Sequence, residues 1–163
     1  MAKPITVYLP YSGQEHARRT IDQLQKSPVV KRICLLTAGG VTNLPARCDQ
    51  LVADSLFGSR TMQQIAQDSK TPGTILVLHD TTIEFGQFAL ERLLAAARLT
   101  GSGMVYSDYH DIQGGQRVSH PVIEYQEGSI RDDFNFGSVL FFDTKVFKAA
   151  AASLEQELKF AGL

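Results

Sequence analysis

The sequence predicts an α/β fold, a three-layer α/β/α sandwich built around a mostly parallel sheet. First, apolar runs of strand length alternate with segments whose apolar residues recur at helical spacing. Second, the apolar runs stop at glycine, proline or polar clusters, which is typical of strands that end at the edge of a sheet. Third, the 163 residues are 44% hydrophobic, which is enough for one domain with a substantial core. This alternation favours parallel pairing with helices on both faces of the sheet.

The N-terminal half is expected to begin with a strand at residues 5–9. Pro10-Tyr11-Ser12-Gly13 ends this strand, because proline and glycine interrupt regular structure. A helix is predicted at 14–25, where Ala17, Ile21 and Leu24 share one face. The next elements are expected to be a strand at 30–36, a short strand at 51–53, a helix from Ser59 as its N-cap to about residue 69, and a strand at 75–78. The inward face of that helix is expected to carry Met62, Ile65 and Ala66.

The C-terminal half contains the strongest helical pattern of the chain, at residues 87–99. Gly101-Ser102-Gly103 ends this helix, and a strand is predicted at 104–106. Gly114-Gly115 separates two polar segments, which predicts a hairpin. A strand at 139–142 and a helix at 144–160 are expected to close the domain. The apolar stripe of the helix at 87–99 is formed by Leu90, Leu93, Leu94 and Ala97.

The composition of the chain limits which partners it can bind and where in the cell it can be expected. The net charge of -1 gives no electrostatic reason to expect binding to nucleic acid or to an anionic membrane surface. The longest apolar runs fall far short of the roughly 20 residues that cross a bilayer, and the chain opens without a signal-peptide pattern. Cys34 is expected to be a buried thiol, and with Cys48 it forms no metal or redox motif. We therefore expect a single domain over 1–163 in the cytoplasm.

Two carboxylates follow two of the predicted strands. The apolar run at 75–78 stops at His79-Asp80-Thr81-Thr82, and the strand at 104–106 runs into Ser107-Asp108. In an open α/β sheet, ligands bind outside the carboxyl ends of the strands. Asp80 and Asp108 could therefore share one ligand or one metal ion, and the sequence predicts a small-molecule site at this edge.

In their order along the chain, these segments resemble a family 2-type glycosyltransferase domain of the GT-A fold. Members of that family move a sugar from a nucleotide-sugar donor to an acceptor. The resemblance covers nearly the whole chain, and the order of its segments is more specific than any one of them. It rests first on the strand ending in Leu9-Pro10-Tyr11-Ser12 and on the helix starting Ser59-Arg60-Thr61-Met62. The strand and loop at 75–82 resemble the strand that ends in the family's metal-binding Asp-x-Asp motif. The strand at 136–143 resembles the strand that leads into the acceptor half of the family's domain.

The resemblance implies a site for a nucleotide-diphosphate sugar linked to UDP or GDP, and an acceptor that is a carbohydrate or a lipid-linked molecule. It implies a divalent cation, Mg or Mn, at Asp80, because such ions take oxygen ligands and offset the charge of a leaving phosphate. Tyr11 would contact the base, and Arg60 opens a helix whose N-terminus favours anions. The donor-binding residues that the resemblance implies are Pro10, Tyr11, Ser12, Asp54, Arg60 and Asp108.

Two features depart from the pattern of the family. In His79-Asp80-Thr81-Thr82 a hydroxyl replaces one carboxylate of the motif, so a cation implied by the resemblance would lose one ligand or be shared with Asp108. The catalytic base of the family usually lies in an acidic pair beyond the strand matched here at 139–142. Either Asp132 or Asp133 deprotonates the acceptor hydroxyl in an inverting transfer, or the chain is the N-terminal, donor-binding part of a longer protein. We favour the second interpretation.

Two other classes of function stay open at this point. A non-catalytic binding or interaction domain would keep the fold without the second carboxylate or the base. A flavodoxin-like receiver needs an acidic cluster after its first strand, and a nucleotidyltransferase would more often show a glycine-rich basic loop there. Pro10-Tyr11-Ser12-Gly13 offers neither. The fold by itself does not decide between these functions.

Overall fold

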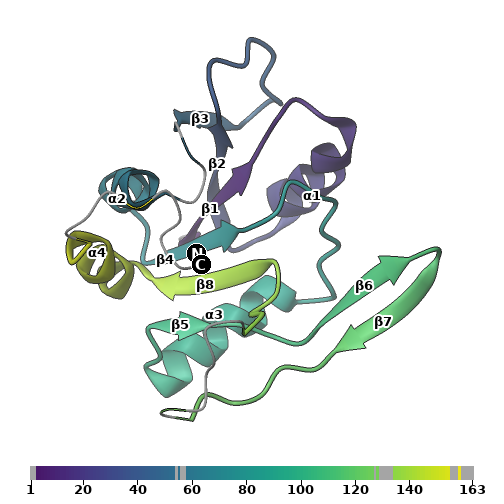
Figure 1. The fold of residues 1–163 in the computed structure, drawn as a ribbon, viewed down its shortest axis with the longest axis vertical. Helices are drawn as coiled ribbons and strands as arrows, with labels where there is room; N and C mark the ends of the chain where they lie inside the picture. Colours follow the sequence, from purple (N-terminus) through teal and green to yellow (C-terminus); the bar gives the residue numbers. More distant parts are fainter. Residues whose placement is uncertain are drawn as a thin grey trace.

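The protein folds around a six-stranded sheet, with a separate two-stranded hairpin projecting from one side (Figure 1). The computed structural model describes residues 3–53, 55, 58–126, 128, 134–154 and 158. Five of the six strands run in the same direction, and helices pack on both faces of the sheet. The predicted three-layer α/β/α architecture with a mostly parallel sheet is therefore confirmed.

Four strands form the continuous parallel part of the sheet. β1 (Ile5–Pro10) lies between β2 (Val30–Thr37) and β4 (Gly73–Val77), and β3 (Asp49–Val52) pairs with the outer side of β2. All residues of β1 and β4 are buried, as expected for parallel strands that are covered on both faces. The observed bounds lie within two residues of the predicted ones, because continuous apolar runs of this length mark buried strands well.

One strand runs against the others. β8 (Val139–Asp143) pairs antiparallel with β4 on one side and with the short strand β5 (Met104–Val105) on the other, which completes the order β3-β2-β1-β4-β8-β5. Gly73 allows the close approach of β8, since a Cβ there would lie 2.7 Å from Cε2 of Phe141. The carboxyl ends of β4 and β5 therefore lie at the same edge of the sheet, but they are separated by one strand, or about 10 Å at normal strand spacing.

The helices form two layers. α1 (Glu15–Lys26) and α3 (Ala89–Thr100) share one hydrophobic cluster with residues of β1, β2 and β4. α2 (Ser59–Asp68) and α4 (Thr144–Ala152) share a second cluster on the opposite face. The predicted apolar stripes of α1, α2 and α3 are all buried. Helix faces of this width are readily recognised from the spacing of apolar residues.

Two helix ends differ from the prediction. Gly58, and not Ser59, is the N-cap of α2, and the hydroxyl of Ser59 accepts a hydrogen bond from the amide of Leu158 at 2.9 Å. α4 was expected to reach residue 160, but it ends at Ala152 with Ser153 as its C-cap. The hydroxyl of Ser153 donates to the carbonyl of Ala150 at 2.8 Å, which satisfies an oxygen in the last turn and helps to end the helix there.

The hairpin predicted around Gly114-Gly115 is confirmed. β6 (Tyr109–Gln113) and β7 (Gln116–His120) pair antiparallel and are joined by these two glycines, whose φ angles are 56° and 81°. A two-residue turn with positive φ at both positions suits the twist of a hairpin and favours glycine. Among the described residues, no helix is long and apolar enough to cross a membrane.

Candidate functional site at the carboxyl edge of the sheet

Three polar side chains meet where β1 and β4 end. The hydroxyl of Ser12 donates to Oδ2 of Asp80 at 2.5 Å, and Nε2 of His16 lies 2.8 Å from Oδ1 of the same carboxylate. Ser12 belongs to the loop between β1 and α1, His16 to the first turn of α1, and Asp80 to the loop after β4. The side chain of His16 is 32% exposed and that of Asp80 is 28% exposed, so both can be reached from solvent.

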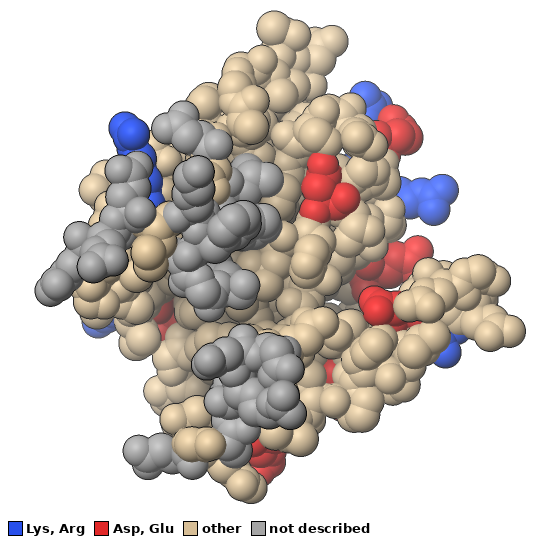
Figure 2. Space-filling model, in the orientation of Figure 1, with Lys and Arg blue, Asp and Glu red and all other residues tan. Residues whose placement is uncertain are grey.

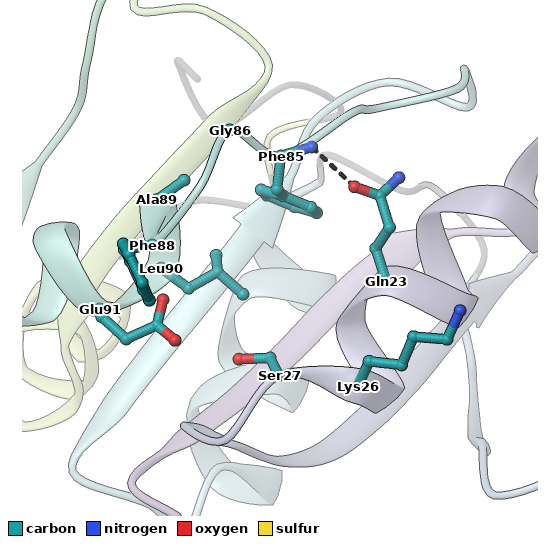
Figure 3. Close-up of a pocket in the computed structure, with 9 residues that line it drawn as sticks. All are labelled: Gln23, Lys26, Ser27, Phe85, Gly86, Phe88, Ala89, Leu90 and Glu91. Atoms are coloured by element: carbon teal, nitrogen blue, oxygen red, sulfur yellow. Dashed lines mark hydrogen bonds between the residues drawn. The ribbon is translucent and has the colours of Figure 1, made fainter.

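The loop that carries Asp80 is attached to α1 by side chains from one face of the helix. The hydroxyl of Thr20 accepts a hydrogen bond from the amide of Ile83 at 2.8 Å, and Thr20 is fully buried. Further along, Oε1 of Gln23 accepts from the amide of Phe85 at 3.0 Å (Figure 3). Positions 16, 20 and 23 follow the spacing of a single helix face. The position of Asp80 is therefore set by α1 as well as by β4.

Thr82 contributes to the same attachment. Its hydroxyl donates to the carbonyl of His16 at 3.2 Å, so the loop contacts the backbone of the residue whose ring faces Asp80. At the other side of β4, Nδ1 of His79 lies 3.1 Å from Oγ of Ser138, and the amide of Leu78 donates to the carbonyl of Ser138 at 2.9 Å. These contacts join the end of β4 to the segment before β8.

The β1–α1 loop places its predicted site residues at different depths. Pro10 is the last residue of β1 and is buried, and Tyr11 is only 4% exposed. The amide of Tyr11 donates to the carbonyl of Leu36 at 2.8 Å, and its ring packs in the hydrophobic cluster beneath α1 and α3. The ring is thus buried, where the sequence suggested contact with a base. Ser12 is the exposed polar side chain of the three.

Asp108 and Asp80 have different partners. The carboxylate of Asp108 is exposed and accepts a hydrogen bond from the amide of Val122 at 2.8 Å, which fixes the chain where it returns from the hairpin. β8 lies between the strands that lead to the two acids. Within the described part of the chain, no three His, Cys, Asp or Glu side chains form a group that could hold a metal ion. A cation at Asp80 would therefore need further ligands from a bound molecule or from water.

The remaining predicted residues are placed as follows. Arg60 is exposed in the first turn of α2, the helix that follows β3. Asp54, Asp132 and Asp133 lie outside the described residues. On the face of the molecule drawn in Figure 2, Lys and Arg side chains lie at the margins and form no basic patch among the described residues. A phosphorylated ligand at the carboxyl edge of the sheet would gain from a cation that neutralises its charge.

His16 is the site residue that sequence reasoning missed. It lies in the first turn of a helix that begins directly after the loop at the end of β1. This position, next to the edge where ligands bind, is the feature of the sequence that could have indicated it. Its approach to Asp80 spans 64 residues of sequence, so no local pattern indicates it.

A separate cavity of about 240 Å³ lies between the C-terminal part of α1 and the start of α3 (Figure 3). Phe85, Phe88 and Leu90 face Gln23 and Lys26 across it. None of the predicted site residues lines this cavity.

No protein-family model matches the chain, and no curated protein sequence matches it significantly. Solved structures do resemble it. The 2-C-methyl-D-erythritol 4-phosphate cytidylyltransferase of Thermus thermophilus has a TM-score of 0.54 at 12% identity, over 91% of this chain and 74% of that one. The 4-diphosphocytidyl-2C-methyl-D-erythritol synthase of Anaerococcus prevotii has a TM-score of 0.59 at 12% identity, over 98% and 78%.

A third solved structure is a CMP:2-keto-3-deoxy-manno-octonic acid synthetase in complex with CTP. Its TM-score is 0.51 at 8% identity, over 95% of this chain and 80% of that one. At these identities the similarity shows the fold alone. The chain therefore shares the α/β fold of these nucleotidyltransferases, and the fold by itself does not decide its activity.

Proposed function

We propose that this chain is a nucleotide-binding transferase domain whose donor is a nucleotide-diphosphate sugar, bound at the carboxyl edge of the sheet beside Asp80. The observation that carries the proposal is the oriented carboxylate of Asp80, which Ser12 and His16 hold at the end of β4. Ligands of open α/β sheets bind at this edge. The fold supports the proposal, since solved enzymes that share it include a synthetase in complex with CTP.

The residues around Asp80 fit a divalent cation such as Mg or Mn. A carboxylate, a hydroxyl and an imidazole nitrogen converge there, and hard cations commonly use one or two protein ligands together with substrate phosphates and water. When bound, the cation would offset the negative charge that develops on the leaving diphosphate. Asp80 is the residue proposed to hold it.

The other predicted residues are proposed to shape the donor site around this point. Pro10 and Ser12 would line the donor, with the buried ring of Tyr11 supporting their loop from beneath. Arg60 would approach the phosphates from the N-terminus of α2, and Asp54 and Asp108 would accept hydrogen bonds from the nucleoside or the sugar. The donor must be oriented before transfer, and such positioning alone lowers the barrier considerably.

In the proposed transfer, an acceptor hydroxyl oxygen attacks the anomeric carbon from the face opposite the diphosphate. The new carbon–oxygen bond forms as the bond to the phosphate oxygen breaks, which inverts the configuration. The proton of the acceptor passes to a carboxylate, for which Asp132 and Asp133 are the candidates. If this chain is the donor-binding part of a longer protein, the remainder supplies that base instead.

Nucleotidyl transfer is the second candidate, because the similar solved structures include two enzymes of the cytidylyltransferase type. It would join a nucleoside monophosphate to an acceptor and release diphosphate from a triphosphate. The loop at 10–14 argues against it, since it contains no Lys or Arg to neutralise the additional phosphate. A third candidate is a binding domain without turnover.

Calorimetric titration of the 163-residue chain with UDP, GDP and CTP, each with and without MnCl2, tests the proposal. We expect UDP or GDP to bind in a Mn-dependent manner, and Asp80→Asn to weaken that binding by about tenfold or more, since changes near a metal site cost this much. The exposed Asp22 on α1 gives a matched control, and Asp22→Asn should bind as the wild type does.

The possible results separate the three functions. Binding of UDP or GDP, followed by release of free UDP or GDP from UDP-glucose, UDP-N-acetylglucosamine or GDP-mannose, would support sugar transfer. Binding of CTP alone, with diphosphate released from it, would overturn the proposal in favour of nucleotidyl transfer. Binding of UDP or GDP without turnover would support the donor site and place the catalytic base outside this chain. No binding of any nucleotide would overturn the proposal in favour of a domain that only recruits a partner.

A further inference from the structure

His16 and Asp80 already lie at a spacing that suits two ligands of one ion. Nε2 of His16 and Oδ1 of Asp80 are 2.8 Å apart. Two neighbouring ligands of an octahedral ion, each about 2.1 Å from the metal, lie about 3.0 Å from one another. The distance between the two atoms would therefore change by only a few tenths of an ångström, and a turn of the imidazole ring would point Nε2 at an ion that lies beside the pair.

The backbone around both ligands is held in place. Thr82, two residues after Asp80, donates to the carbonyl of His16 itself at 3.2 Å. One turn further along α1, the hydroxyl of Thr20 accepts from the amide of Ile83 at 2.8 Å. The loop and the helix therefore form one frame, and a site built on such a frame keeps its geometry when a ligand binds.

The open side of the pair faces solvent. Both side chains are about one-third exposed, so an ion and the phosphates that accompany it can approach without unfolding the loop. The hydroxyl of Ser12 donates a hydrogen bond to the other carboxylate oxygen of Asp80. A hydrogen bond to the second oxygen is the kind of outer contact that orients a ligating carboxylate.

We propose that His16 is a nitrogen ligand of the divalent cation at Asp80, and that the site consequently prefers a first-row transition ion such as Mn to Mg. The inference rests on the proposed function, which places a divalent cation at Asp80. To ligate, His16 gives up the Nε2 proton that it donates to Asp80, carries its remaining proton on Nδ1 and offers the lone pair of Nε2 to the ion. Mg strongly favours oxygen ligands, whereas imidazole suits transition metals, so the added nitrogen shifts the preference.

A different role for His16 would be to orient Asp80 through their hydrogen bond alone. His16→Gln distinguishes the two roles, because a glutamine amide can still donate to the carboxylate but has no imidazole lone pair. In the orienting role this variant would retain the metal preference of the wild type. In the ligating role it would lose most of that preference.

The test is a titration of the 163-residue chain with MnCl2, in the presence and absence of UDP, followed by electron paramagnetic resonance. Electron spin-echo spectra of the bound Mn report directly whether a nitrogen is coordinated, and competition with MgCl2 gives the preference. We expect nitrogen modulation in the wild type and its loss in His16→Gln, with Mn binding weakened by about tenfold or more. His110→Gln, at an exposed position on β6, should resemble the wild type.

A second variant guards against indirect effects of the substitution. In His16→Ala, added imidazole should restore nitrogen modulation at Asp80, and circular dichroism should match that of the wild type. Nitrogen modulation that persists in His16→Gln, or Mn that binds the wild type without nitrogen modulation, would overturn the inference.

The inference and the proposed function can fail separately. If the wild type binds UDP but no Mn, the ligand assignment is overturned and the nucleotide site remains. If it binds Mn with nitrogen modulation but no UDP, GDP or CTP, the ligand assignment is supported and the transferase function is overturned.

Discussion

Asp68 joins α2 to the sheet through two hydrogen bonds. The hydroxyl of Tyr8 in β1 donates to it at 2.6 Å, and Nη1 of Arg32 in β2 lies 2.5 Å from the same carboxylate oxygen. Arg32 also pairs with Asp49 in β3. Burial would raise the pKa of Asp68, but the hydrogen bonds from Arg32 and Tyr8 outweigh it and hold that pKa below its usual value. Burial, together with Asp68, raises the pKa of Tyr8 well above its ordinary value.

This network makes the free energy of unfolding depend on pH. A carboxyl whose pKa is depressed in the native state binds fewer protons than in the unfolded state, so its contribution is present above the unfolded pKa. The stabilisation from Asp68 is lost as the pH falls below about 4, the pKa of the unfolded state, and then through the lower pKa of the native state. We expect Asp68→Asn to reduce the free energy of unfolding by about 1–3 kcal/mol at pH 7.

Urea unfolding between pH 3 and 7 measures this effect. The difference between the wild type and Asp68→Asn should shrink on acidification, because the wild type then loses the charged hydrogen bonds too. Asp22→Asn, at an exposed position, should follow the wild type throughout. A difference between wild type and Asp68→Asn that stays constant over this range would show that the charge of Asp68 does not stabilise the fold.

At the scale of elements, the loop after β4 depends on α1 for its conformation. The fully buried hydroxyl of Thr20 accepts from the amide of Ile83 at 2.8 Å and donates to its carbonyl at 3.2 Å. Gln23 also binds this loop through its amide group. Because loops without regular pairing must satisfy their backbone groups elsewhere, the polar face of α1 takes the place of a neighbouring strand.

Thr20→Val keeps the shape of the side chain and removes the hydrogen bonds between Thr20 and the backbone of Ile83. We expect a loss of about 1–3 kcal/mol in the free energy of unfolding, since the amide of Ile83 is left without its partner. Hydrogen exchange of the amides at 81–85 should also become faster, and Mn-dependent nucleotide binding should weaken because Asp80 is held less firmly. Thr42→Val, at an exposed position in the loop between β2 and β3, serves as the control. Unchanged exchange in Thr20→Val would mean that the loop is held by other contacts.

At the scale of the whole molecule, β8 joins the edge strand β5 to β4 and so to the parallel part of the sheet. Phe141 pairs with Ile75 of β4 and with Val105 of β5, and its ring is 2% exposed in the cluster that α1 and α3 cover. The approach of that ring to Gly73 shows how closely β8 packs on β4. The last strand of the chain thus contributes a buried aromatic side chain to the core, although β8 lies next to the edge of the sheet.

Phe141→Ala is therefore expected to lower the free energy of unfolding by about 3–5 kcal/mol, the usual cost of emptying a buried aromatic position. Ile112→Ala, at a position that is 61% exposed on the hairpin, should change it by no more than about 0.5 kcal/mol. Urea unfolding followed by circular dichroism measures both. A loss below about 1 kcal/mol in Phe141→Ala would contradict the role of the Phe141 ring in the core.

The sequence by itself determined the class of the fold and the kind of each element. The apolar runs of β1, β2 and β4, the stripes of α1, α2 and α3, and the glycine turn of the hairpin were all identified correctly. It also indicated Asp80 at the end of β4, because the change from apolar to polar residues at a strand end is local. Such features depend on neighbours within a few residues, which the sequence displays directly.

Only the tertiary structure decided the order of the strands and the surroundings of the candidate site. The insertion of β8 between β4 and β5 separates the strands that lead to Asp80 and Asp108, although the sequence suggested that these acids share a ligand. Burial of the Tyr11 ring and the contact of His16 with Asp80 were likewise not apparent. These features depend on which distant segments pack together, and the energy of that packing is summed over the whole core and is not encoded in any local pattern.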